Sequence, residues 1–105
     1  MFTRETAIDK VKAFLIDCQQ LPVQIERAIL FGSVVKGKAN EDSDIDLALF
    51  SPNFGDNILA NLDMIGKINI RYPEIDVHTF HSTHSDGTGI LLYQILNDGV
   101  EVSVA

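Results

Sequence analysis

Hydrophobic and polar positions along the chain recur with two different periods, and these periods predict its secondary structure. After Thr3, a residue type that caps helices, apolar residues recur every three or four positions as on one face of an α-helix. The inner face of this helix is expected to consist of Ile8, Val11, Leu15 and Cys18. Pro22 lies just beyond its expected end.

Two apolar runs follow and predict strands. Arg27–Phe31 is expected to be a mostly buried strand that Gly32 ends, and Ile45–Phe50 a second strand that Ser51 and Pro52 break. The polar segment 33–43 between them contains Gly37 and is expected to form a loop or a single helical turn.

The second half of the chain predicts two helices and two strands. One helix is expected to be capped by Asp56 and to end at Tyr72-Pro73. Its expected inner residues are Ile58, Leu62, Ile65 and Ile68, and its expected outer residues are Asp63, Lys67 and Arg71. The segment 74–80 alternates polar and apolar residues and predicts a strand.

A last helix, roughly 89–97, is expected to be capped by Ser85 or Asp86 and stopped by Gly99. Alternating valines then predict a short strand over 100–104. The order α-β-β-α-β-α-β predicts an α/β (α+β) fold, with a mixed sheet of about four strands covered by helices. The length of 105 residues suits one domain, 1–105. Because helix 89–97 is apolar on more than one face, a homo-oligomer or partner interface is a secondary expectation.

Composition narrows the class of protein. No apolar run approaches the roughly 18–20 residues that cross a bilayer, and the N-terminal residues lack a signal-peptide pattern, so we expect a cytoplasmic protein without membrane contact. Cys18, the single cysteine, is expected to be a buried, inert thiol. The net charge of −7 makes nucleic acid an unexpected partner, although it is compatible with a phosphate ligand carried by a divalent metal.

One glycine-rich segment resembles a phosphate-binding P-loop, but the pattern fails in two ways. Gly32, Gly37 and Lys38 match G-x-x-x-x-G-K-[ST], whereas Ala39 stands where a hydroxyl should reach magnesium. A P-loop also needs a helix of several turns after the glycines, and only residues 39–43 separate Lys38 from the next strand. We therefore reject the P-loop.

Three aspartates predict a metal site. Asp44 and Asp46 lie two apart on a predicted strand, so both are expected on one face, about 6.5–7 Å apart along the chain. Asp76 lies in the middle of another predicted strand, where a carboxylate is costly unless it is solvated, paired or metal-bound. Such a set can hold two Mg²⁺ ions. Glu74 and His78 share the expected face of Asp76, so either is expected to support the metal ligands or to contact the nucleotide.

The segment before the first aspartate pair suits phosphate. Gly32 lets backbone N–H groups approach a phosphate, and Ser33 adds a hydroxyl. Gly37 permits the return turn, and Lys36 supplies a cation. Each feature alone has an ordinary explanation as a turn or as exposed carboxylates, and it is their combination that favours a functional site.

Gly32-Ser33, Gly37 and Ser43-Asp44-Ile45-Asp46-Leu47 resemble the signature of the DNA polymerase β-like nucleotidyltransferase superfamily. The chain is similar in length and element order to its minimal nucleotidyltransferase (MNT) branch. The resemblance implies transfer of a nucleoside monophosphate, usually AMP from ATP, to an acceptor hydroxyl.

Carried over to this sequence, the resemblance assigns nucleotide contacts to Gly32, Ser33, Lys36, Gly37 and Ser43. It assigns two Mg²⁺ ions and catalysis to Asp44, Asp46 and Asp76. Relatives of this size often act with a HEPN-domain protein as a toxin–antitoxin pair, adding AMP to a tyrosine of that partner.

The chain departs from many relatives because Val34, Val35 and Lys36 replace loop arginines, so triphosphate affinity could be modest. A contact-only binding module that neutralises a partner protein therefore stays open as an alternative. Nucleotide addition to RNA or to a small molecule such as an aminoglycoside is a third interpretation, and no extra domain or basic surface supports it. His78, His81 and His84 are expected near the site rim rather than as zinc ligands.

Overall fold

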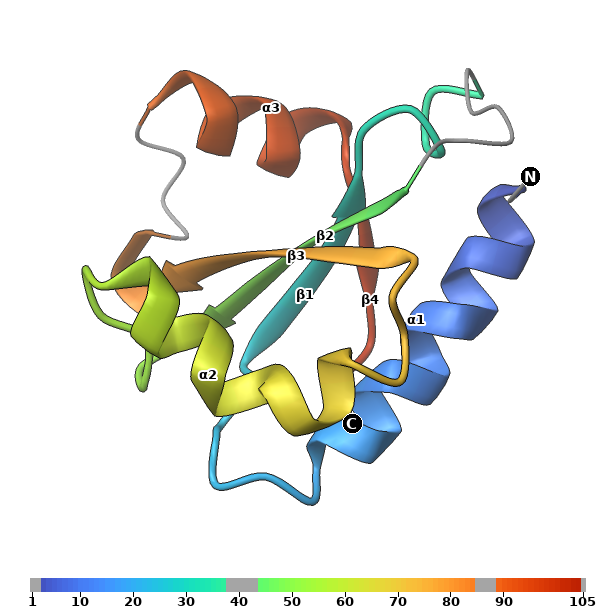
Figure 1. The fold of residues 1–105 in the computed structure, drawn as a ribbon. Helices are drawn as coiled ribbons and strands as arrows, with labels where there is room; N and C mark the ends of the chain where they lie inside the picture. Colours follow the sequence, from blue (N-terminus) through green and yellow to red (C-terminus); the bar gives the residue numbers. More distant parts are fainter. Residues whose placement is uncertain (1–2, 38–43, 85–88, 105) are drawn as a thin grey trace.

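The computed structural model describes residues 3–37, 44–84 and 89–104, which form a four-stranded mixed sheet and three α-helices (Figure 1). Strand order is β3-β2-β1-β4; β1 is antiparallel to β2 and β4, and β2 is parallel to β3. The elements are α1 (Arg4–Cys18), β1 (Arg27–Phe31), β2 (Ile45–Ser51), α2 (Ile58–Asn69), β3 (Ile75–His81), a 3₁₀ turn (Ser82–His84), α3 (Ile90–Asp98) and β4 (Val100–Val102). The predicted mixed sheet and α+β class are confirmed.

Helices cover both faces of the sheet. Helices α1 and α2 lie on one face, and α3 lies on the other (Figure 1). Because strand side chains alternate between faces, Ile45, Leu47 and Leu49 of β2 enter the larger core under α1 and α2. Ala48 and Phe50 enter the smaller core under α3. The face that α3 covers is also the face on which even-numbered residues of β2 and β3 lie.

Several sequence expectations for the helices are confirmed. Thr3 caps α1 in a capping box with Thr6, and Val11, Leu15 and Cys18 are buried. Gly99 is the C-cap of α3, where its backbone N–H donates to the carbonyl of Ile95. No helix within 3–37, 44–84 or 89–104 is long and apolar enough to cross a membrane.

Two expected helix caps are wrong. Asn57, not Asp56, caps α2, because the Asn57 side chain accepts a hydrogen bond from the N–H of Ala60. Ile58 is 64% exposed instead of facing inward, since Phe54 and Asn61 supply the buried side chains near that end of the helix. The N-cap of α3 is Gly89, which offers no side chain; Ser85 and Asp86 lie outside the described residues.

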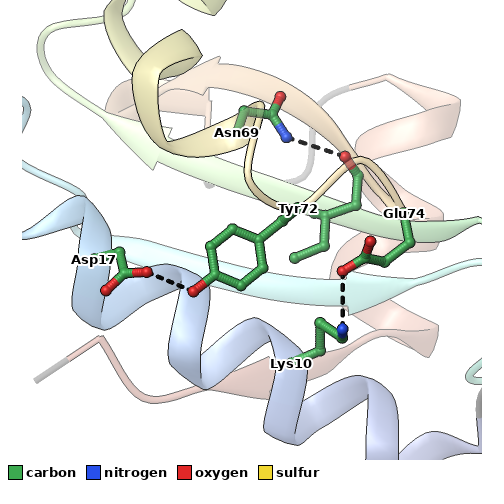
Figure 2. A network of polar contacts seen from close by, with 6 residues as sticks. Lys10, Asp17, Asn69, Tyr72 and Glu74 are labelled. Carbon is green, nitrogen blue, oxygen red and sulfur yellow. Dashed lines mark hydrogen bonds and ion pairs between the residues drawn. The ribbon is translucent and has the colours of Figure 1, made fainter.

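A polar network fixes the segment that leads into β3 (Figure 2). Tyr72 donates a hydrogen bond to Asp17 of α1, which raises the pKa of the phenol, and Lys10 of α1 forms an ion pair with Glu74 at 3.2 Å. Asn69 donates to the carbonyl of Ile75 at 3.2 Å. These contacts hold the start of β3 against α1 and the end of α2, and so set the position of the residues that follow in that strand.

Asn61 is one of two buried polar residues in the described part of the chain, and both polar atoms of its side chain form hydrogen bonds. Its carbonyl oxygen accepts from the N–H of Gly55 at 2.9 Å, and its amide donates to the Gly55 carbonyl and to the Thr79 hydroxyl at 3.0 and 3.1 Å. Asn61 therefore joins α2 both to the preceding loop and to β3.

Replacing Asn61 by alanine should destabilise the fold by about 1–3 kcal/mol, because it removes a buried side chain and its three part-buried hydrogen bonds. Urea unfolding would measure the loss. Asn97→Ala, which removes an exposed side chain of α3, serves as the control and should change stability by less than about 0.5 kcal/mol. Equal losses in the two variants would contradict the role given to Asn61.

The Cys18 thiol is buried as expected, and burial raises its pKa to about 12, with the nearby Asp17 charge adding to the shift. The folded state therefore favours the neutral thiol, and raising the pH above the unfolded-state pKa should destabilise the fold. At pH 8 we expect the native protein to react with iodoacetamide at least about a hundredfold more slowly than the protein in guanidinium. Comparable rates in both states would show that the thiol is accessible and ionised.

Candidate active site

Two aspartates lie side by side near the N-terminal ends of the neighbouring strands β2 and β3. The strands run parallel with Asp46 directly opposite Asp76, and Asp46 also pairs with Phe31 of β1. Because the flanking Ile45 and Leu47 are buried on the opposite face, the Asp46 and Asp76 carboxylates share the face that α3 partly covers. The proximity of these two residues, inferred from sequence, is thus found in the fold.

His78 completes a compact group with these aspartates. Its Nε2 atom lies 3.6 Å from Oδ1 of Asp46 and 3.4 Å from Oδ2 of Asp76, and its ring packs edge-on against Phe31 with centroids 5.0 Å apart. One ligand atom from each of Asp46, Asp76 and His78 lies within 4.8 Å of the others. The three side chains can therefore reach a common ion.

The electrostatics of the group favour a cation. Burial is the main cause that raises the pKa of Asp46, His78 opposes it, and the charges of Asp76 and Asp44 raise it further. The group thus holds carboxylates that repel one another at a partly dehydrated position. A bound divalent ion would offset both costs.

Asp44 lies outside this compact group. Strand β2 begins at Ile45, so Asp44 precedes the strand and its side chain is exposed. The expectation that Asp44 lies on the strand together with Asp46 is therefore wrong. It is close enough for its charge to affect Asp46, but it is not one of the residues whose ligand atoms lie within 4.8 Å. Ser43 lies outside the described residues.

Gly32 contacts the Asp46 carboxylate in a way that only glycine permits. Its φ is +82°, a left-handed conformation that costs little only for glycine. A Cβ built on Gly32 would collide with Oδ2 of Asp46. The absence of a side chain therefore lets the carboxylate lie directly against the backbone that begins the glycine turn.

Residues 33–37 form the single turn that was expected as one of two possibilities. The N–H of Lys36 donates to the carbonyl of Gly32 at 3.3 Å, and Gly37 has a φ of +71°. Lys36 is exposed, and Ser33 is half-buried beside Gly32. The N–H groups of Lys36 and Gly37 are thus donated within the turn, and the Ser33 hydroxyl and the Lys36 ammonium lie on the segment that follows the contact between Gly32 and Asp46.

Val34 and Val35 have a structural role that the sequence analysis missed. Both are buried, at 3% and 9% exposure, in the core under α1 and α2. Arg4 also donates a hydrogen bond to the carbonyl of Val35 at 2.9 Å. These contacts anchor the glycine turn to the core, so the two valines have a structural role apart from any contact with phosphate.

A hollow of about 180 Å³ opens beside the glycine turn. Its lining comprises Phe31, Gly32, Lys36, Leu91, Gln94 and Asp98. The three residues from α3 were not predicted as part of the site, because the sequence analysis treated that helix mainly as an apolar packing element. Their spacing of three and four positions, which places them along one side of the helix, was the available signal.

Other expected contributors lie elsewhere. Glu74 precedes β3, so the strand period does not apply to it, and it pairs with Lys10 of α1 instead of facing the site (Figure 2). His81 belongs to β3 instead of the following loop, because the strand pairs as far as Ser51–His81, and its Nδ1 accepts from the N–H of Thr83. His84 lies in the 3₁₀ turn.

The donor set fits a divalent metal. Asp46 and Asp76 supply the hard oxygen ligands that Mg²⁺ prefers, and the close approach of Gly32 leaves the Asp46 carboxylate beside the phosphate-compatible turn. The imidazole nitrogen of His78 lies between both carboxylates, and among the described residues it has no hydrogen-bond partner in good geometry. Two carboxylates and one unsatisfied imidazole are a set that a metal ion would complete.

Comparisons with known proteins agree on one kind of domain. The family model described as "Polymerase beta, Nucleotidyltransferase" matches residues 10–104. A crystal structure of a candidate nucleotidyltransferase from Sulfolobus solfataricus superposes with a TM-score of 0.68 at 19% identity, covering 93% of this chain and 80% of that one. No curated protein matches the sequence.

Proposed function

Since the chain belongs to the nucleotidyltransferase domain family of polymerase beta, we propose that it transfers a nucleoside monophosphate, AMP from ATP, to an acceptor hydroxyl. The observation that carries the proposal is the pairing of Asp46 with Asp76 on adjacent strands, against the backbone of Gly32. That arrangement supports the proposal, because it brings two candidate metal ligands beside a glycine turn of the kind that binds phosphate.

Each residue has a chemical role in this proposal. Asp46 and Asp76 would hold Mg²⁺, with Asp44 as an outer ligand for a second ion. When bound, the metal would neutralise charge on the triphosphate and on the departing pyrophosphate. Backbone N–H groups after Gly32, the Ser33 hydroxyl and the Lys36 ammonium would bind the β- and γ-phosphates. Gly37, and Ser43 beyond the described residues, would shape the turn.

The proposed transfer needs no reactant other than the nucleoside triphosphate and the acceptor. The acceptor oxygen forms a bond to the α-phosphorus, and the bond from that phosphorus to the α,β-bridging oxygen breaks, releasing pyrophosphate with the electron pair. Asp76, the more exposed aspartate of the pair, at 56% against 28% for Asp46, would accept the acceptor's proton. Its exposure leaves room for an acceptor to approach.

We further propose that the acceptor is a tyrosine hydroxyl of a HEPN-type partner protein, so that the chain acts as the antitoxin of a toxin–antitoxin pair. Large apolar side chains on the outer surfaces of α2 and α3 support a protein partner, among them Leu59 at 76% and Tyr93 at 62% exposure. The net charge of −7 favours a protein acceptor over a nucleic acid.

The test incubates the protein with Mg²⁺, the protein encoded beside it in the genome, and ATP labelled at either the α- or the γ-phosphate. We expect the neighbouring protein to gain label from α-labelled ATP only. Label from γ-labelled ATP would indicate a kinase. No label, together with a stable complex of the two proteins that survives Asp46→Asn, would make this chain a contact-only binding module.

A further inference from the structure

The imidazole of His78 is the least explained polar group of the site. Its Nε2 atom is buried, faces Asp46 and Asp76, and has no hydrogen-bond partner in good geometry among the residues that the structure describes. A buried nitrogen without a well-aligned hydrogen bond costs free energy, so its position beside two carboxylates calls for a ligand. The strand period explains the position of the imidazole beside Asp76, since His78 lies two residues after Asp76 on the same face of β3.

The distances favour a shared ion over direct hydrogen bonds. At 3.4 and 3.6 Å, Nε2 is too far from the two carboxylates for good hydrogen bonds, which have lengths of about 2.7–3.2 Å. Two ligand atoms that each lie about 2.1 Å from one metal ion can be at most about 4.2 Å apart. The Nε2 separations from Asp46 and Asp76 both fall inside that limit.

The ring of His78 is also held in place. Phe31 of the central strand β1 packs edge-on against it, with an angle of 67° between the ring planes. A ring supported on one side and facing two carboxylates at its Nε2 edge is oriented as a metal ligand would need to be.

We propose that His78 is a metal ligand that makes this site prefer a divalent first-row transition ion, such as Mn²⁺ or Co²⁺, over Mg²⁺. The ion would be bound by one oxygen each of Asp46 and Asp76 and by Nε2 of His78. Imidazole nitrogen adds affinity for transition ions, whereas Mg²⁺ gains little from it and prefers oxygen and water. The inference rests on the metal site of the proposed function and specifies which ion that site takes.

The test titrates the protein, without nucleotide or acceptor, with Co²⁺ by visible absorption and with Mg²⁺ by competition. We expect the wild type to bind Co²⁺ at least about tenfold more tightly than Mg²⁺. His78→Asn should lose about tenfold or more in Co²⁺ affinity and less than about threefold in Mg²⁺ affinity. His81→Asn, which removes an imidazole at the far end of the same strand, is the matched control and should match the wild type.

Two outcomes would overturn the proposal. Unchanged Co²⁺ affinity in His78→Asn would show that the ring is only a packing element. Tighter binding of both ions would show that His78 acts as a cation that competes with metal. In the wild type, Zn²⁺ should shift the ¹⁵N resonance of Nε2 of His78 specifically, a readout that does not depend on whether the variant folds.

The outcome is separable from that of the proposed reaction. A protein that binds Co²⁺ through His78 but transfers no nucleotide refutes the proposed function alone. A protein that transfers AMP but has the same metal preference in wild type and in His78→Asn refutes this inference alone.

Discussion

Replacing Asp46 by asparagine should lower nucleotide transfer by on the order of a thousandfold, because the metal loses a charged ligand worth several kcal/mol in the transition state. The same change should leave the fold as stable as the wild type, or more stable. Burial and the neighbouring Asp76 and Asp44 charges raise the pKa of Asp46, so the ionised carboxylate is unfavourable in the metal-free fold. Activity and stability should therefore respond in opposite directions.

Transfer rates with α-labelled ATP and thermal unfolding without metal would measure both effects. Asp63→Asn is the matched control, since it removes an exposed carboxylate of α2 and should change neither quantity much. If Asp46→Asn kept more than about a tenth of the activity, a ligand worth several kcal/mol could not be this carboxylate.

The second large effect is expected from Gly32→Ala, which should reduce transfer by on the order of a hundredfold and lower the melting temperature. The added Cβ would collide with Oδ2 of Asp46, and a displacement of about 1 Å at a reacting centre is enough for such a loss. The left-handed φ of +82° adds about 1–2 kcal/mol of backbone strain.

Gly37→Ala separates the collision from the strain. Gly37 also has a positive φ, +71°, but a Cβ there meets nothing within 4 Å. We expect Gly37→Ala to lose stability through strain and to lose much less activity than Gly32→Ala. Equal losses of activity in the two variants would mean that strain in the turn, and not the contact with Asp46, determines the rate.

Much of this fold could be predicted from the sequence because the apolar residues of its strands and helices recur at the strand and helix periods. Alternation in each strand predicted that Asp46 and Asp76 lie opposite their apolar neighbours, and the parallel pairing of β2 with β3 brings the two aspartates together. The local sequence does not specify that β2 pairs with β3, since this pairing depends on contacts between segments about thirty residues apart.

Other features depended on tertiary contacts that no local pattern contains. Glu74 has the spacing of a site residue, but Lys10 of α1 binds it on the other side of the sheet. Val34 and Val35 lie in a turn whose sequence suggested only phosphate binding, and only the packing of the turn shows that both side chains belong to the core. The spacing of Leu91, Gln94 and Asp98 places them on one side of α3, but only the placement of α3 over β1 shows that this side lines a hollow beside the glycine turn.

The most direct measurement is a crystal structure of the protein with Mn²⁺ and an ATP analogue that cannot be cleaved between the α- and β-phosphates. We expect an anomalous peak about 2.1–2.2 Å from carboxylate oxygens of both Asp46 and Asp76, with the triphosphate against the backbone after Gly32. A nucleotide bound away from this aspartate pair, or bound there without a metal ion, would contradict the proposed site.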